Sequence, residues 1–270
     1  MKAKPAIAII QARMSSERLP KKVMKKLAGK PVIWHVYQRA KQCKLVDKVV
    51  IATSVHRSDD ELVEYCIENG LNYYRGSLSN VLRRFIDILK KENFKYYVRI
   101  TGDCPLICPQ FIDNQIYALN KYDGDITWTF NLGEALVGQG VHTVRSLRHI
   151  ATNADDVENH EHVGAIYLSK NPHLFRIVEL NPPSDLLGGN RVTIDEKADL
   201  MLVKALYGEL FKENEIISLR DALLWINSNP EQSVINRSVQ HSPINTETRL
   251  NERKWISVPK VGKAIYDVNL

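Results

Sequence analysis

The stretch AIAIIQARMSSERLPKKVMKKLAGKPVI, residues 6–33, joins an apolar run directly to a loop crowded with cations. The first five residues are all apolar, which is typical of a strand buried on both faces of a sheet. Many basic side chains follow, and Glu17 alone opposes them. The cations are Arg13, Arg18, Lys21, Lys22, Lys25, Lys26 and Lys30. Converging Arg and Lys donors suit a phosphorylated ligand, although a solvated basic surface would also show this composition.

Beyond this stretch, segments of strand length alternate with segments of helical periodicity. Strands are predicted at 48–53, 72–74 and 96–101. Helices are predicted to begin after Pro31, at a capping box formed by Ser58 and Glu61, at Ser79 and at Pro109. This alternation predicts an α/β fold with a mostly parallel sheet and helices on both faces. Ligands of such sheets bind beyond the carboxyl ends of the strands, where the basic loop falls.

The second half is less regular. We predict strands at 126–130, 142–144, 175–179 and 191–194 and helices at 161–169, 197–211 and 218–227. The signal weakens from residue 230 to 270, which could be an arm, a dimer contact or a partly disordered tail.

Composition narrows the class of protein. Hydrophobic residues at 44% and charged residues at 25% suit a soluble globular protein, and no apolar run is long enough for a membrane helix. We find no secretion signal and expect a cytoplasmic protein without membrane contacts. The net charge of +6 is concentrated in one loop, which favours a small polyanion over nucleic acid. The cysteines form no C-x-x-C pair, so we expect free thiols.

Two aspartates are candidate metal ligands. Asp103 lies just past a predicted strand in RITGDCPLI, and Asp195 follows another in NRVTIDEKADL. Each has a simpler interpretation, because Asp is common in turns and at helix N-caps. Mg²⁺ typically takes one or two protein carboxylates together with substrate phosphates. With the basic loop, the two aspartates form a coherent constellation for a metal-bound nucleotide.

Several motifs together resemble those of a known family. Residues 9–33 resemble the signature of cytidylyltransferases that activate acidic sugars. Gln11 stands where most of these enzymes have proline, and in this the sequence resembles the SpsF-type branch of spore-coat polysaccharide biosynthesis. The segments RGS (75–77), NVLRR (80–84), RITGDCPLI (99–107), EHV (161–163) and RVTIDEKADL (191–200) fit the same branch. The resemblance covers about residues 6–210.

The resemblance implies a Rossmann-like nucleotidyltransferase fold and a Mg²⁺-dependent transfer of CMP from CTP to an acidic sugar or related anionic acceptor. It implies a nucleotidyltransferase domain over 1–229, with an insertion for the acceptor site or dimerisation at about 126–190, and a homodimer. Arg13, Lys22 and Asp103 would be catalytic, and Asp103 and Asp195 would bind the metal. The nucleotide pocket would be formed by Gln11, Ala12, Arg13, Lys22, Ala52, Thr53, Ser79 and Asn80. Arg75 and Arg84 would brace this pocket or contact the acceptor. Apart from the resemblance, His142 and His162 are further candidates for acceptor contacts.

One departure and two alternatives stay open. The segment GQGVHTVRS (138–146) has His142 and Thr143 where related enzymes carry acids, so the acceptor could be unusual. A DxD glycosyltransferase would use Asp123 and Asp125 for its metal, but it would leave the basic loop unexplained. A non-catalytic nucleotide-binding homologue is the second alternative, and the two retained aspartates argue against it.

Overall fold

The structure is a computed structural model that describes residues 4–90, 92–129, 134–154, 156–187, 191–239 and 264–268. Its strands are β1 (Lys4–Gln11), β2 (Lys26–Leu27), β3 (Lys30–Pro31), β4 (Lys48–Ser54), β5 (Tyr73–Gly76), β6 (Phe94–Thr101), β7 (Ile126–Trp128), β8 (Gln139–Thr143), β9 (Ile177–Asn181) and β10 (Ala264–Asp267). Its α-helices are α1 (Val32–Lys41), α2 (Asp60–Glu68), α3 (Val81–Leu89), α4 (Pro109–Tyr122), α5 (Val144–Asn153), α6 (Val157–Glu161), α7 (Ala165–Lys170), α8 (Lys197–Leu210), α9 (Leu219–Ser228) and α10 (Pro230–Ser233). Its 3-10 helices are η1 (Lys22–Met24), η2 (Arg57–Asp59), η3 (Glu134–Leu136), η4 (Pro172–Leu174) and η5 (Ser184–Leu186).

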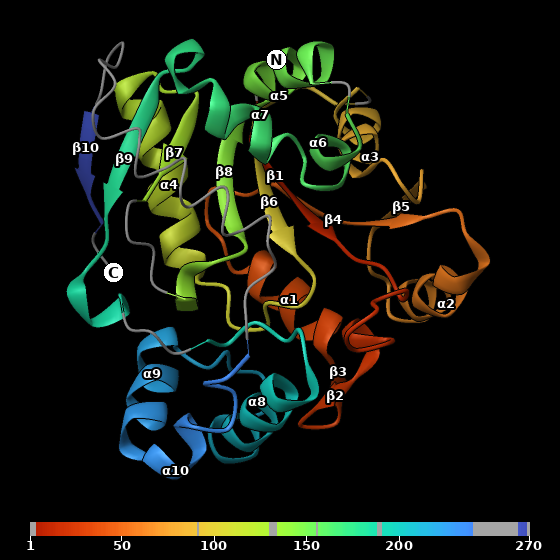
Figure 1. Cartoon of the computed structure of the whole chain (residues 1–270), viewed down its shortest axis with the longest axis vertical. Helices are drawn as coiled ribbons and strands as arrows, with labels where there is room; N and C mark the ends of the chain where they lie inside the picture. The colour runs from red at the N-terminus through yellow and green to blue at the C-terminus, as the bar shows by residue number, and fades with distance from the viewer. Residues whose placement is uncertain are drawn as a thin grey trace.

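Eight of the described strands form one sheet, in the order β10-β9-β7-β8-β6-β1-β4-β5 (Figure 1). β1 lies between β6 and β4 and runs parallel to both. β8 runs antiparallel to β6 and β7. β2 and β3 form a separate short hairpin. The prediction of a mostly parallel Rossmann-like sheet is therefore confirmed.

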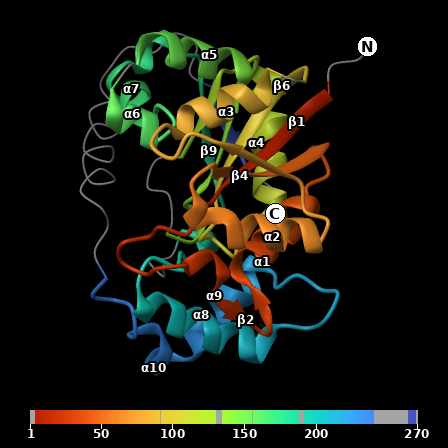
Figure 2. The ribbon, with the colours of Figure 1, turned by 90° about the vertical axis from the view of Figure 1, so that its right-hand side faces the viewer.

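Helices cover both faces of this sheet (Figure 2). Ala8 and Ile10 of β1 belong to the larger core cluster with residues of α1, α2, α4, α8 and α9. Ile7 and Ile9, which alternate with them, pack with residues of α3, α5 and α7. Each of these β1 isoleucines is at most 1% exposed, and burying such a side chain stabilises the fold by about 1.5–3 kcal/mol.

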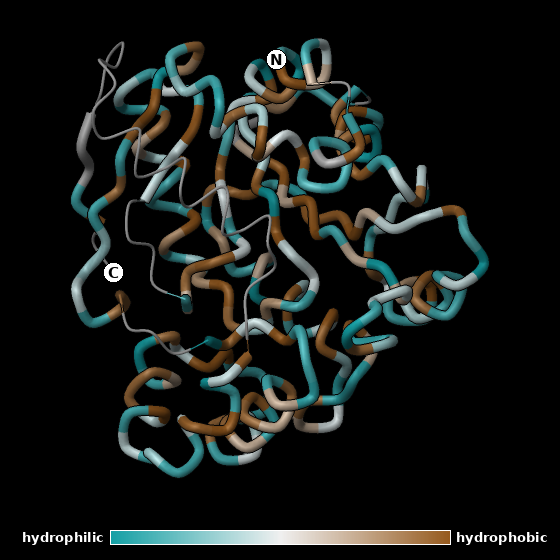
Figure 3. The backbone as a smooth tube through the Cα atoms, viewed as in Figure 1, coloured by the Kyte–Doolittle hydropathy of each residue, from teal (hydrophilic) through white to brown (hydrophobic). Residues whose placement is uncertain are grey.

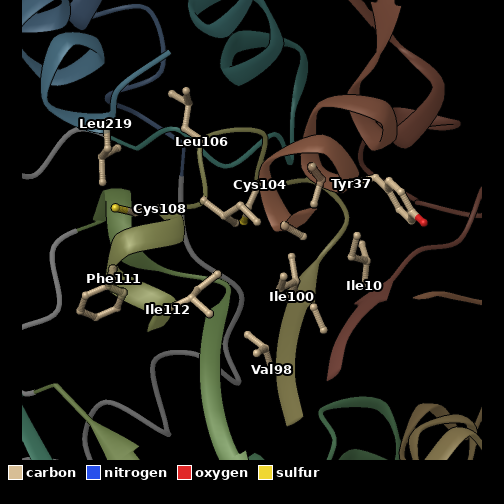
Figure 4. Packing of buried hydrophobic residues seen from close by; sticks show 14 of the residues in the cluster. Ile10, Tyr37, Val98, Ile100, Cys104, Leu106, Cys108, Phe111, Ile112 and Leu219 are labelled. Atoms are coloured by element: carbon tan, nitrogen blue, oxygen red, sulfur yellow. The ribbon is translucent and has the colours of Figure 1, made fainter. Parts of the chain in front are cut away.

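The first face is seen closely in Figure 4, where Ile10 of β1 and Ile100 of β6 lie in the same cluster as Ile112 of α4. Among the described residues, hydrophobic colour marks the central strands and also parts of the helices below them (Figure 3). An all-apolar first strand is thus explained by its central position between two helical layers.

Two predicted elements differ in the structure. Residues 191–194 form no strand, although β-branched Val192, Thr193 and Ile194 suggested one; their described backbone joins no sheet ladder. The predicted helix at 161–169 is two helices, α6 and α7, because Val163 (φ 55°) and Gly164 (φ 76°) turn the chain into the left-handed region.

The C-terminal segment contributes to the sheet. β10 pairs in parallel with β9, for example Ile265 with Glu179, and so forms its edge. Residues 240–263 of the predicted arm lie outside the described residues, as does Phe130 at the end of one predicted strand. All four cysteines are free and buried, as predicted. In the described part of the chain, no helix has the length and apolar character needed to cross a bilayer.

Candidate functional site

The basic loop folds back over the carboxyl end of β1. Ala12 N–H donates to Ala52 O of β4 (3.2 Å). Farther along the loop, Lys21 N–H donates to Met14 O (3.0 Å), which closes the loop on itself. Lys21 has a left-handed backbone (φ 57°), which ends the reversal and starts η1 at Lys22. The loop thereby brings Lys22 back to the edge of the sheet where β1, β4 and β6 end.

Lys22 bridges the two predicted metal ligands. Its Nζ donates to Asp103 and, at 2.9 Å, to Asp195 Oδ1. The two carboxylates are held together by the backbone, because Ile194 N–H donates to Asp103 O at 2.9 Å. Burial alone would lower the pKa of the Lys22 ammonium, but the charges of Asp103 and Asp195 outweigh it and raise the pKa. Lys22 is therefore a fixed cation at neutral pH.

Asp195 is surrounded by cations. Arg18 Nη2 lies 2.9 Å from Asp195 Oδ1, and Arg191 pairs with the other oxygen. Burial opposes ionisation of Asp195, but Lys22 first, and then Arg191 and Arg18, lower its pKa. The sequence reading placed Asp195 at the end of a strand. Instead it lies in a short irregular segment, and the bond from Ile194 brings it to Asp103. Its backbone N–H donates to Asp199 Oδ2 (2.9 Å), within the N-terminal capping box of α8.

Arg13 points in another direction. Its Nη2 lies 2.9 Å from Glu161 Oε1 of α6, and both side chains are nearly half exposed. The structure thus places Lys22 with the two aspartates, but Arg13 bridges to the helices of the predicted acceptor region. Glu161, the first residue of the EHV segment (161–163), thus contacts the basic loop through Arg13.

Asp59 organises the basic loop, and the sequence reading missed it. This fully buried carboxylate accepts Met14 N–H through Oδ1 at 2.8 Å and Ser54 N–H through Oδ2 at 3.2 Å. We predicted a capping box from Ser58 and Glu61, but His56 Nδ1 accepts Ser58 N–H instead. The available signal was the pair of adjacent acids Asp59 and Asp60, five and six residues after the end of β4, because one of the two could turn inward while the other faced solvent.

The pair Asp59 and Asp60 gives a matched test. In Asp59→Asn the amide nitrogen replaces one acceptor oxygen beside backbone N–H donors, so we expect a loss of about 1–3 kcal/mol of unfolding free energy. The half-exposed Asp60, paired with Arg75 at 2.6 Å, should cost less than about 1 kcal/mol as Asp60→Asn. Urea unfolding measures both. Equal stabilities of the two variants would remove Asp59 from this role.

Arg75 and Arg84, the predicted acceptor contacts, are tied to the β4 edge. Arg75 donates to Ser54 O (2.9 Å) and His56 O (3.2 Å) as well as to Asp60. Arg84 is 2% exposed and donates to Ala52 O at 2.9 Å. Burial lowers the pKa of Arg84 to about 10, which still leaves the guanidinium charged at neutral pH. The described contacts of both arginines are thus with the protein itself, at the carboxyl end of β4 and the segment that follows it.

The predicted nucleotide-pocket residues lie along the same edge. Gln11 Oε1 accepts from Arg99 Nε at 2.9 Å across β1 and β6. Thr53 Oγ1 is buried without a hydrogen-bond partner in the described part of the chain. Asn80, rather than the expected Ser79, caps α3 by accepting Arg83 N–H at 2.7 Å. The residues predicted to bind the nucleotide therefore come largely from the carboxyl ends of β1 and β4 and from the N-terminus of α3.

The two histidines differ in their surroundings. His142 stacks on Tyr97 with ring centroids 5.4 Å apart, and its Nδ1 is buried without a partner among the described residues. Desolvation first, and then the charge of Arg99, lower the pKa of His142 to about 3. His162 also has a lowered pKa, caused by burial and then by Arg99. Both imidazoles are neutral at pH 7.

The neutral His142 should make stability depend on acid. Its pKa of about 3 lies below the ordinary value of about 6.5, so between these pH values the unfolded chain binds the extra proton. Stability is then lost as pH falls, by up to about 1.4 kcal/mol per pH unit from this group. Urea unfolding at pH 7, 6 and 5 should show that His142→Phe has a shallower decline than wild type. His173→Phe, at an exposed histidine, should keep the wild-type slope; a wild-type slope in His142→Phe would contradict the prediction.

The aspartates of the alternative DxD interpretation are engaged elsewhere. Asp125 pairs with Arg145 and accepts Arg176 N–H at 3.0 Å, and Asp123 lies 2.6 Å from Arg176 Nη2. They precede β7, which runs in the direction of β6, so they lie at the opposite edge of the sheet from Lys22. Their contacts are those of a structural cluster.

Comparison with known proteins identifies the family. The model of the cytidylyltransferase family matches residues 7–206. The chain belongs to the cytidylyltransferase family. It is 36% identical over 87% of its length to an uncharacterized protein of Methanocaldococcus jannaschii, of which it covers 95%. It is 32% identical over 83% of its length to the spore coat polysaccharide biosynthesis protein SpsF of Bacillus subtilis, of which it covers 94%.

A solved cytidylyltransferase from Leptospira borgpetersenii superimposes with a TM-score of 0.78 at 25% identity, over 88% of this chain and 99% of that one. The predicted membership of the family, with its SpsF-type branch, is confirmed, and the protein is a nucleotidyltransferase. The matched span contains the basic loop, Asp103 and Asp195, so the cluster around Lys22 lies wholly within the family's region.

Proposed function

We propose that this cytidylyltransferase transfers CMP from CTP to an anionic sugar or related acceptor, with release of pyrophosphate, in the synthesis of a surface polysaccharide or glycan. The observation that carries the proposal is the convergence of Lys22, Asp103 and Asp195 from three distant segments at the carboxyl edge of the sheet. A nucleoside triphosphate needs cations for its phosphates and carboxylates for its metal, and this edge offers both.

Asp103 and Asp195 fit a divalent cation. Their oxygens already converge on one positive centre, the Lys22 ammonium, and hard carboxylate oxygens are the donors that Mg²⁺ takes. The described residues contain no group of three or more His, Cys, Asp or Glu side chains that could hold a metal by themselves. This suits Mg²⁺, which is commonly bound by one or two carboxylates plus substrate phosphates. When bound, the ion would neutralise charge on the phosphate oxygens.

The chain's own residues position and stabilise the reacting groups. Lys22 supplies charge to the phosphates beside the two carboxylates, and Arg13 binds the triphosphate from the outer side of the basic loop. Asp59 holds the backbone of that loop through Met14. The acceptor oxygen forms a bond to the α-phosphorus while the bond to the β-phosphate oxygen breaks and pyrophosphate leaves. Such transfer depends on positioning and electrostatics, which is what this cluster provides.

The acceptor enters from the side of α6 in this proposal. Glu161 pairs with Arg13, and the neutral His162 lies close enough to Arg13 and Arg99 for their charges to lower its pKa. Two arginines here suit an acceptor that carries negative charge. Arg75, Arg84 and His142 then act from behind the site, since their described contacts are with the protein itself.

Pyrophosphate release tests the function directly. CTP, UTP, ATP and GTP are each combined with a panel of acidic sugars and Mg²⁺, and we expect release with CTP and one class of acceptor. Calorimetry with CTP and Mg²⁺ serves as the control for a protein that binds nucleotide without turnover. Release from UTP or ATP but not from CTP would contradict the proposed donor. We also propose that the protein is a cytoplasmic homodimer. Light scattering of the purified protein tests whether it is a dimer.

A further inference from the structure

A cavity lies beside the hairpin that ends the basic loop, and Lys22, Asp103 and Asp195 are not among the residues that line it. It measures about 550 Å³, within the range of small-molecule sites, and it lies between the β2–β3 hairpin, α1, the end of α8 and the loop that follows α8. Figure 1 shows these elements together below the sheet. Three aromatic residues, Trp34, Tyr207 and Phe211, form part of its wall.

The cavity has a built cationic centre. Arg39 lines it and is only 3% exposed. The Arg39 guanidinium donates to Ile107 O and Ile217 O, each at 2.6 Å, and no described acid pairs with it. Burial lowers the pKa of Arg39, and the charges that oppose this shift are those of Tyr207, Cys108 and Cys43 rather than of carboxylates. A buried cation without an anionic partner is costly, and an anion that reached it would remove that cost.

The other polar groups at the cavity fit the same ligand. Lys30 Nζ lies 5.7 Å from the centre of the Trp34 ring at the rim. His35 is buried, and desolvation first, with the nearby charges of Arg39 and Lys30, lowers its pKa, so its imidazole is neutral and does not compete with Arg39 for an anion. The acids at the cavity, Glu213 and Glu215, are exposed on the loop after α8, and Glu215 lies 4.0 Å from Lys212. The cation is therefore deep and the carboxylates are at the outside.

We propose that this cavity is an effector site for a small organic anion, a phosphate ester or carboxylate on an aromatic or other planar ring. The anionic group pairs with Arg39, and the ring packs against Trp34, Tyr207 and Phe211. Aromatic walls and one buried cation are the usual means by which a pocket selects such a molecule.

The walls of the cavity hold the loops of the candidate active site. Tyr207 Oη donates to Pro105 O at 2.7 Å and Arg39 to Ile107 O, both in the turn that carries Asp103. The His35 ring nitrogen Nε2 lies 2.9 Å from Leu27 O of the hairpin that follows Lys22. A ligand that shifts these side chains would also shift the turn that carries Asp103 and the hairpin that follows Lys22. We therefore expect it to change CTP affinity, and this effect rests on the proposed function, whereas binding itself does not.

Calorimetric titration with phenyl phosphate and benzoate tests the site, with inorganic phosphate and phenol as probes that lack the ring or the charge. We expect saturable binding of a ring-bearing anion that is stronger than that of either partial probe. The response to phenyl phosphate against benzoate tells which anionic group the site prefers. Binding must persist with saturating CTP and in Lys22→Met, because both remove the candidate active site as the location.

Variants locate the ligand. Arg39→Met and Trp34→Ala should each weaken binding about tenfold or more. If Arg39→Met does not fold, Lys30→Glu at the rim should still weaken it, with Lys26→Glu on the same hairpin as the unaffected control. The site is refuted if no ring-bearing anion binds, or if Lys22→Met abolishes binding while Trp34→Ala leaves it intact. Bound ligand with no change in the dissociation constant of CTP would refute the effector role alone.

Discussion

Asp103→Asn should lower kcat for pyrophosphate release by about 100- to 1000-fold, the loss typical when one preorganised charge is removed from an active site. The substitution removes a negative oxygen from the pair that faces Lys22 and keeps the size of the side chain. The backbone bond from Ile194 N–H to Asp103 O does not involve the side chain and should remain. Thermal unfolding should therefore change little.

A matched control separates chemistry from folding. Asp185 is an exposed aspartate that pairs with Arg220 at 2.6 Å rather than with Lys22, so Asp185→Asn should keep wild-type turnover. Raising the Mg²⁺ concentration should partly restore Asp103→Asn if the loss lies in metal binding. Wild-type kcat in Asp103→Asn would exclude Asp103 from the mechanism, whatever the stability data show.

The central sheet could be predicted from the sequence because its signal is local. Residues 6–10 are apolar without interruption, as a strand covered on both faces requires. Pro109 likewise starts α4 as predicted, because its fixed backbone suits the first turn of a helix. In such segments, propensity, hydrophobic pattern and tertiary structure agree.

Errors arose where a long-range contact overrides a local pattern. Val192 and Ile194 are β-branched apolar residues, which predicts a strand. They are buried in the core, but no neighbouring strand pairs with them in the described part of the chain. Asp59 lies within a sequence pattern that predicts a helix cap. In the structure its side chain instead accepts a hydrogen bond from Met14 N–H, 45 residues away in the chain. No local rule contains that contact.

The candidate site was predicted in part for the same reason. Asp103 and Asp195 were predicted to meet because each follows an apolar run, and two such runs were expected to end at one edge of the sheet. They do meet, but residues 191–194 join no sheet, and the bond from Ile194 N–H to Asp103 O connects the two segments instead. The direction of Arg13 toward Glu161 depends on how α6 packs against the loop, which no spacing in the sequence encodes. The cavity at Arg39 was equally invisible, because its wall comes from α1 and from the end of α8.

Lys22→Met should reduce kcat/KM for CTP by about 100-fold while changing the KM of the acceptor much less. The methionine keeps the length of the side chain but removes the charge that lies between Asp103 and Asp195. The phosphates then lose a cation, and Asp103 loses the cation that pairs with it, while Asp195 keeps Arg18 and Arg191, so the carboxylate of Asp103 repels the negative triphosphate as well. Steady-state kinetics with each substrate varied in turn measures the two constants.

Two further variants decide which role of Lys22 matters. Lys26→Met removes an exposed lysine of the same loop and should leave both constants unchanged. Lys22→Arg keeps the charge, so it should recover most of the affinity for CTP if charge on the phosphates is what counts. If the ammonium serves mainly to hold the two carboxylates in place, Mg²⁺ should bind Lys22→Met at least as tightly as wild type, since the competing cation is gone. Equal losses toward CTP and the acceptor in Lys22→Met would contradict both roles, because neither places Lys22 beside the acceptor.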